Sequence, residues 1–126
     1  NRLKKQPTTE ELIERGFAPK NGKVDILFIY PPSTVADRLG VKDIGEIGGD
    51  TIPLGIASLA AYLREKDFGV GVLDCTALRL NIDEIYEIIK KKDPAIIGYS
   101  VTTYGLGTAL EIAKEIRENR RNIRKK

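Results

Sequence analysis

Histidine, methionine and tryptophan are absent from the 126-residue sequence, and cysteine occurs once, as Cys75. Without histidine the chain cannot build a histidine-based catalytic triad or a histidine metal site. A single cysteine excludes an internal disulfide framework and any metal site made of several cysteines. We therefore predict no catalytic residue and no metal ligand in this chain.

Long apolar runs are also missing. No stretch of about eighteen apolar residues occurs, so no transmembrane helix and no membrane partner are expected. The N-terminal stretch NRLKKQPTTEE is polar, which does not resemble a signal peptide, and we expect a cytoplasmic protein. Apolar residues make up 41% of the chain and charged residues 31%, a composition typical of one globular domain.

Basic residues gather at the C-terminus, where seven basic and two acidic residues lie between Lys114 and Lys126. Such a tail can contact nucleic acid. More often it is a solvated helix end, because Lys and Arg favour the C-terminal pole of the helix dipole. We therefore do not expect nucleic acid as a partner.

Three strand–helix units follow a short N-terminal helix, which begins with a capping box of Thr8 and Glu11. Apolar runs predict strands at 26–30, 68–74 and 95–101, and the first run is continuous enough to be buried on both faces. The helices begin at Pro53, after the cap Asn81, and after the loop TTYGLG. Helical spacing predicts these buried positions: Ile56, Leu59, Ala60 and Leu63; Ile82, Ile85, Ile88 and Ile89; Leu110, Ala113, Ile116 and Ile123.

This order predicts an α/β fold of the flavodoxin-like or Rossmann-like type. The three layers are α/β/α, with three parallel strands in the order 2-1-3. We assign residues 1–22 to an N-terminal helix and linker, and residues 23–126 to the α/β domain. The sequence stops where a fourth strand is expected, so the sheet is either truncated or covered by a partner at its third-strand edge.

Small residues dominate the first strand-connecting helix, where Gly55, Ala57, Ser58 and Ala60 occupy positions that Leu or Glu would fill better. One interpretation is that a ligand or a second domain lies against the start of this helix. The other is that small residues permit close packing of the helix on the sheet. The sequence alone favours neither.

The ligand site of an open α/β sheet lies beyond the carboxyl ends of the strands, where the strand order reverses. Neither a P-loop motif nor a glycine-rich dinucleotide fingerprint follows the first strand. Asp74 could hold a ribose hydroxyl or cap its loop, and Cys75 is more plausibly a semi-buried residue than a nucleophile. Ser100, Thr102 and Thr103 offer hydroxyl groups for an anion or an amide, or for local capping.

The segments ILFIYPP, PLGIASLAAYLREKDFGVGVLD and IIGYSVTT, in this order, resemble the N-terminal cobalamin-binding domain of cobalamin-dependent radical SAM enzymes. The resemblance covers roughly residues 24–118. It implies a flavodoxin-like domain that holds the corrin ring over the strand ends and faces a radical SAM barrel. The [4Fe-4S] cluster and S-adenosylmethionine would then belong to that missing partner domain, because the Cys-x-x-x-Cys-x-x-Cys motif is absent here.

The resemblance also implies which residues border the cofactor. They come from the loop after the first strand, the start of the following helix, and the ends of the second and third strands. These cofactor-binding candidates are Pro31, Pro32, Ser33, Gly49, Thr51, Pro53, Leu54, Gly55, Ser58, Asp74, Ser100, Thr102 and Thr103.

Two functions from different classes therefore remain open. In the first, the chain is the cobalamin-binding module of a radical SAM, methyltransferase-like enzyme, and its partner is the radical SAM domain. In the second, it is a non-catalytic α/β interaction domain that no longer binds the cofactor and self-associates over the third-strand edge.

Overall fold

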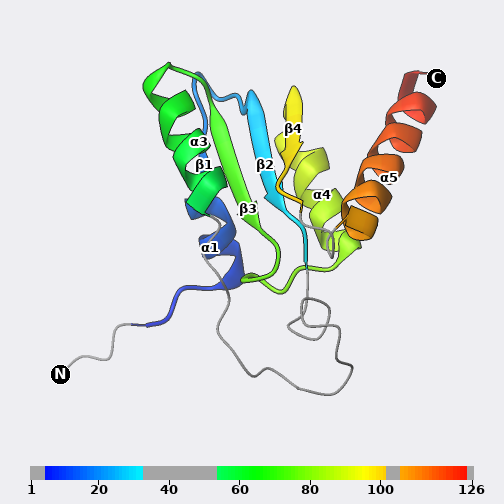
Figure 1. Ribbon diagram of the computed structural model, residues 1–126, viewed down its shortest axis with the longest axis horizontal. Coiled ribbons are helices and arrows are strands. Elements are labelled where there is room, and N and C mark those ends of the chain that lie inside the picture. The colour runs from blue at the N-terminus through cyan, green and yellow to red at the C-terminus, as the bar shows by residue number, and fades with distance from the viewer. Residues whose placement is uncertain (1–4, 33–53, 102–105, 125–126) are drawn as a thin grey trace.

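The computed structural model describes residues 5–32, 54–101 and 106–124. Its helices are α1 (Thr9–Arg15), α3 (Leu54–Glu65), α4 (Ile82–Lys92) and α5 (Leu106–Arg124). Its strands are β1 (Phe17–Ala18), β2 (Ile26–Tyr30), β3 (Val70–Asp74) and β4 (Ile96–Tyr99). Figure 1 shows the sheet between α3 on one side and α4 with α5 on the other, so the predicted three-layer α/β/α fold is confirmed.

The sheet has four strands in the order β1-β3-β2-β4. The central strand β2 pairs in parallel with β3 on one side and with β4 on the other, so that Ile26 lies between Val70 and Ile96. These three parallel strands have the predicted order 2-1-3. The connection from β2 to β3 through α3 and the connection from β3 to β4 through α4 run in opposite directions along the sheet. Because both are right-handed, α3 and α4 lie on opposite faces.

The strand β1 was not predicted. It pairs antiparallel with β3, and Phe17 lies opposite Gly71. A tight turn then leads back toward the sheet: Lys20 and Lys23 exchange backbone hydrogen bonds of 2.9 and 3.0 Å, and Asn21 and Gly22 have positive φ values of 52° and 74°. The segment predicted as helix and linker therefore contributes an edge strand to the sheet.

The helix α1 is attached to α4 through one lysine. Lys92 Nζ lies 2.7 Å from a carboxylate oxygen of Glu14 and 4.5 Å from the centre of the Phe17 ring. The hydrogen bond to Lys92 lowers the pKa of Glu14. Both predicted capping boxes, at Thr8 with Glu11 and at Asn81 with Glu84, are confirmed.

The main core lies between the sheet and the layer of α4 and α5. Leu27 and Ile29 of β2, Leu73 of β3, Ile85 of α4 and Ile112 of α5 are all fully buried there. The prediction that β2 is buried on both faces is wrong, because Ile26, Phe28 and Tyr30, which face α3, are only half-buried. Among the described residues, α3 covers this second face, and it packs more on β3 than on β2.

Two predicted core positions are also wrong, for a related reason. Leu59 of α3 is 55% exposed and Leu110 of α5 is exposed, whereas Ile56, Ala60, Ala109 and Ile112 are buried. Both α3 and α5 contact the sheet through a narrow row of apolar side chains. Leu59 and Leu110 lie beside that row, where they meet no neighbouring element among the described residues.

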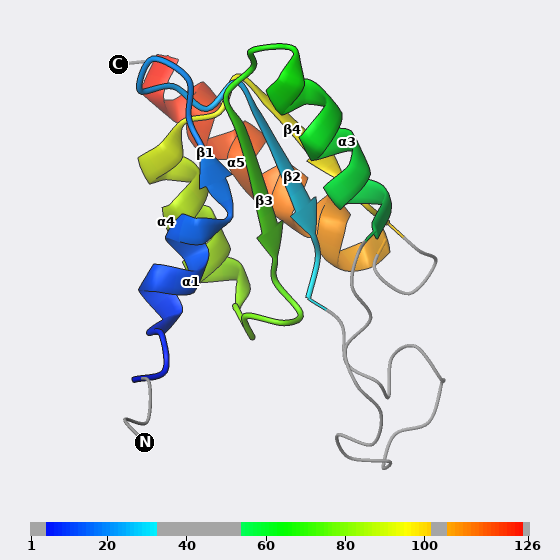
Figure 2. The same cartoon turned by 90° about the vertical axis from the view of Figure 1, so that its left-hand side faces the viewer.

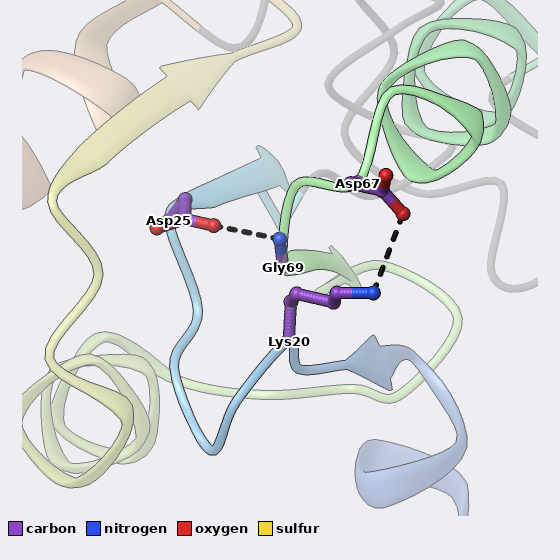
Figure 3. A network of polar contacts seen from close by, with 4 residues as sticks. All are labelled: Lys20, Asp25, Asp67 and Gly69. Carbon is purple, nitrogen blue, oxygen red and sulfur yellow. Dashed lines mark hydrogen bonds and ion pairs between the residues drawn. The ribbon is translucent and has the colours of Figure 1, made fainter.

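A small polar network joins the loops at the amino ends of the strands (Figure 3). The Asp25 carboxylate accepts a hydrogen bond of 2.7 Å from the backbone N–H of Gly69, and the Gly69 carbonyl accepts one of 2.8 Å from the backbone N–H of Asp25. Lys20 and Asp67 form an exposed ion pair of 3.3 Å, which contributes little. The backbones approach so closely here that a Cβ at position 69 would overlap the Lys23 carbonyl.

We therefore expect Gly69→Ala to lower the free energy of unfolding by about 2–3 kcal/mol, because the added methyl group must displace backbone. The matched control is Gly55→Ala, since a Cβ at that helical position meets none of the described atoms within 4 Å. The control should be neutral or gain up to about 1 kcal/mol from helix propensity. Urea denaturation followed by circular dichroism measures both, and equal stabilities of the two variants would contradict the described packing.

Candidate functional site

The carboxyl ends of β2, β3 and β4 lie at the same edge of the sheet, and α3 and α5 both begin there (Figure 2). From β2 the chain continues to α3 on one face, and from β4 it continues to α5 on the other. The strand order therefore reverses between β2 and β4. This is where the crevice of a doubly wound sheet is found.

Hydrogen bonds hold the residues after β2 and β4 next to each other. The Ser100 backbone N–H donates to the Ile29 carbonyl at 2.9 Å, which extends the pairing of β4 with β2 by one step. Pro31, buried directly after β2, accepts a hydrogen bond of 3.0 Å at its carbonyl from the Thr76 hydroxyl. Pro32 is half-buried beside it. The structure thus places Pro31 and Pro32, which follow β2, and Ser100, which follows β4, at the same edge of the sheet.

Thr76 was missed by the sequence reasoning. Its hydroxyl ties the loop after β3 to the first residue after β2, and these positions are 45 residues apart in the chain. A hydroxyl two residues beyond a predicted strand is a weak signal, because such residues commonly bond within their own turn.

Asp74 has a local role. Its Oδ1 accepts a hydrogen bond of 3.1 Å from the Ala77 backbone N–H, and its carbonyl accepts one of 3.1 Å from Leu78. Asp74 ends β3, on the side of β2 away from the reversal point. Of the two interpretations that the sequence left open, this geometry favours the loop cap.

The start of α3 presents an exposed surface at the same sheet edge. Leu54 is 70% exposed, and Gly55 and Ser58 are exposed as well. Close packing on the sheet explains Ala60, which is buried. It does not explain the exposed Ala57, or Gly55, whose Cβ position has no neighbour in the part of the chain that the structure describes. The small residues therefore leave room on the outside of α3.

The remaining candidates, Ser33, Gly49, Thr51, Pro53, Thr102 and Thr103, lie outside the described residues. Within the described ranges no group of three or more His, Cys, Asp or Glu side chains is placed to hold a metal ion. None of the helices in those ranges is long and apolar enough to cross a bilayer.

Comparison with known proteins identifies the family. A family model described as the B12 binding domain matches residues 40–125. The chain belongs to the B12-binding domain family. This assignment confirms the resemblance to a cobalamin-binding domain, and the flavodoxin-like α/β architecture agrees with it. No solved structure matches the chain.

One curated relative is an uncharacterized methyltransferase, PH0819, of Pyrococcus horikoshii. It is 39% identical over 97 residues, which are 75% of this chain and 20% of the relative. This B12-binding domain therefore spans about a fifth of the relative's length.

The one thiol of the B12-binding domain is fully buried. Burial, together with the nearby charge of Asp74, raises the pKa of Cys75 to about 12. Its hydrogen atom points toward the Leu73 carbonyl, with a sulfur–oxygen distance of 3.7 Å. A thiol in this state is not an activated nucleophile.

We expect Cys75 to react with Ellman's reagent at pH 8 at least about a hundredfold more slowly in the native protein than in 6 M guanidinium chloride. In the native protein little of the thiol is ionised and the reagent cannot reach the buried sulfur. The measurement is the absorbance of the released thiolate over time. Native labelling at the denatured rate would show that Cys75 is accessible, against the structure.

Proposed function

We propose that this chain is the cobalamin-binding module of a radical SAM enzyme with methyltransferase-like chemistry. It carries the corrinoid and leaves the radical chemistry to another domain. Membership of the B12-binding family supports the cofactor. The relative that is named a methyltransferase and is about five times longer than the matched segment supports a larger enzyme around it.

The observation that carries the proposal is the open surface at the start of α3, at the sheet edge where the parallel strands have their carboxyl ends. A corrin is a broad, flat macrocycle, and it needs a surface from which no side chain protrudes. Gly55 offers such a surface because no atom of the described residues lies within 4 Å of its Cβ position, and the exposed Leu54 provides apolar contact next to it. The residues present therefore fit the group.

This chain would bind and orient the corrinoid without ligating its metal through histidine, because the sequence contains none. Bound cobalamin supplies the methyl-carrying cobalt chemistry. Pro31 and Ser100 would border the ring at the reversal point, and Leu54, Gly55 and Ser58 would lie along its edge. A single cysteine cannot hold a [4Fe-4S] cluster, so that cluster and S-adenosylmethionine would belong to the radical SAM partner domain.

The direct test mixes the purified chain with hydroxocobalamin, removes free ligand on a desalting column, and records the visible spectrum. We expect the protein fraction to retain a corrinoid spectrum. A colourless fraction from folded protein would contradict the proposal and favour the alternative, a non-catalytic interaction domain.

A pair of variants on α3 locates the site. Gly55→Leu places a large side chain on the proposed surface, and we expect it to raise the Kd for hydroxocobalamin at least about tenfold. Ala61→Leu is the matched control, since Ala61 is also small and exposed but lies more than one turn further from the sheet edge. Equal affinity of the two variants would place the cofactor elsewhere.

A further inference from the structure

The chain leaves β2 through two consecutive prolines, Pro31 and Pro32. Neither proline has a backbone N–H group to donate, and each ring holds its own φ near about −65°. Pro31 is also restricted in ψ, because it precedes a proline. The direction of the chain at the end of β2 is therefore narrowly limited, and only carbonyl oxygens remain there as backbone groups that can be held by hydrogen bonds.

The loop after β3 supplies donors to two of these carbonyls. The Cys75 backbone N–H donates to the Tyr30 carbonyl at 3.0 Å, which extends the pairing of β3 with β2 by one step. The Thr76 hydroxyl donates to the Pro31 carbonyl, also at 3.0 Å. Because this second bond is made by a side chain, a substitution removes it and leaves the backbone pairing in place.

The bond to Pro31 lies at the start of the segment that leads from β2 to α3. On the other side of β2, the Ser100 backbone N–H donates to the Ile29 carbonyl at 2.9 Å, so the end of the strand is held from both neighbours. Pro31 is buried, and a buried carbonyl that loses its donor is costly. The hydroxyl of Thr76 therefore constrains where the chain passes as it leaves the sheet.

We propose that Thr76 is a positioning residue for the corrinoid. By holding the Pro31 carbonyl, its hydroxyl fixes Pro31 and Pro32 at the sheet edge where α3 begins. A rigid macrocycle binds more tightly to a surface that is already ordered, because the cost of ordering that surface is not subtracted from the binding free energy. This inference rests on the proposed function.

A similar hydrogen bond at the opposite edge of the sheet provides the control. The Asp25 carboxylate accepts a hydrogen bond of 2.7 Å from the backbone N–H of Gly69 (Figure 3). Like the Thr76 bond, it is part-buried and joins a side chain to distant backbone, across 44 residues compared with 45. Asp25 precedes β2 whereas Thr76 follows β3, so the two bonds stabilise opposite ends of the parallel strands.

The experiment measures the Kd for hydroxocobalamin by absorbance titration of the full chain and three variants. Thr76→Val removes the hydroxyl and keeps the side-chain shape, Thr76→Ser keeps the hydroxyl, and Asp25→Ala removes the control bond. Urea denaturation of each variant detects any loss of stability. Exchange of the Cys75 amide proton, measured by NMR without the cofactor, reports on the pairing at the end of β2.

We expect Thr76→Val to raise the Kd about fivefold, and Thr76→Ser to stay within about twofold of the wild type. Asp25→Ala should lower the urea midpoint and leave the Kd unchanged, which separates positioning from a general loss of stability. Without the cofactor, Thr76→Val should speed exchange of the Cys75 amide at least about fivefold.

A Kd for Thr76→Val equal to that of the wild type would overturn the proposal. So would a Kd that Thr76→Ser does not restore, or unchanged exchange of the Cys75 amide in Thr76→Val. A wild-type chain that binds no corrinoid would contradict the proposed function itself, and the amide exchange would then still decide whether Thr76 holds the end of β2.

Discussion

The parallel pairing of β2 with both β3 and β4 is the constraint on which the rest of the structure depends. Leu27 and Ile29 of β2 are fully buried under α4 and α5, and the same strand carries hydrogen bonds on both sides. Because β2 is central, the two crossovers must run in opposite directions and place helices on both faces. The reversal of strand order at the end of β2 then creates the position where the candidate site lies.

The sequence predicted this central part well because its signals are strong. Apolar runs bounded by proline or charge set the bounds of β2 and the end of β3, and the caps Thr8 and Asn81 located two helix starts. The strand β1 could not be predicted, since two residues have no periodicity. It exists because Gly71 leaves space for the Phe17 ring, and a Cβ there would lie 2.5 Å from ring atoms. That is a tertiary contact, which local patterns do not record.

The site was predicted less completely. The sequence positions identified residues at the strand ends, and the structure places Pro31, Pro32 and Ser100 at one edge of the sheet. The structure also shows that the Asp74 side chain accepts a hydrogen bond within its own loop, which was one of the two roles that the sequence left open. The small residues of α3 could mean either packing or an outside contact. Packing explains the buried Ala60, and it does not explain the exposed Gly55. Such a distinction depends on which side of α3 meets the sheet.

The central claim is that the corrinoid lies at the carboxyl edge of the sheet, against the start of α3. The most direct measurement is a titration of the ¹⁵N-labelled chain with hydroxocobalamin, followed by amide chemical shifts. The account predicts shifts concentrated at Gly55, Ser58 and Ser100, with Gly22 and Gly69 at the opposite edge unchanged. Shifts concentrated at Gly22 and Gly69, or none at a saturating corrinoid concentration, would contradict it.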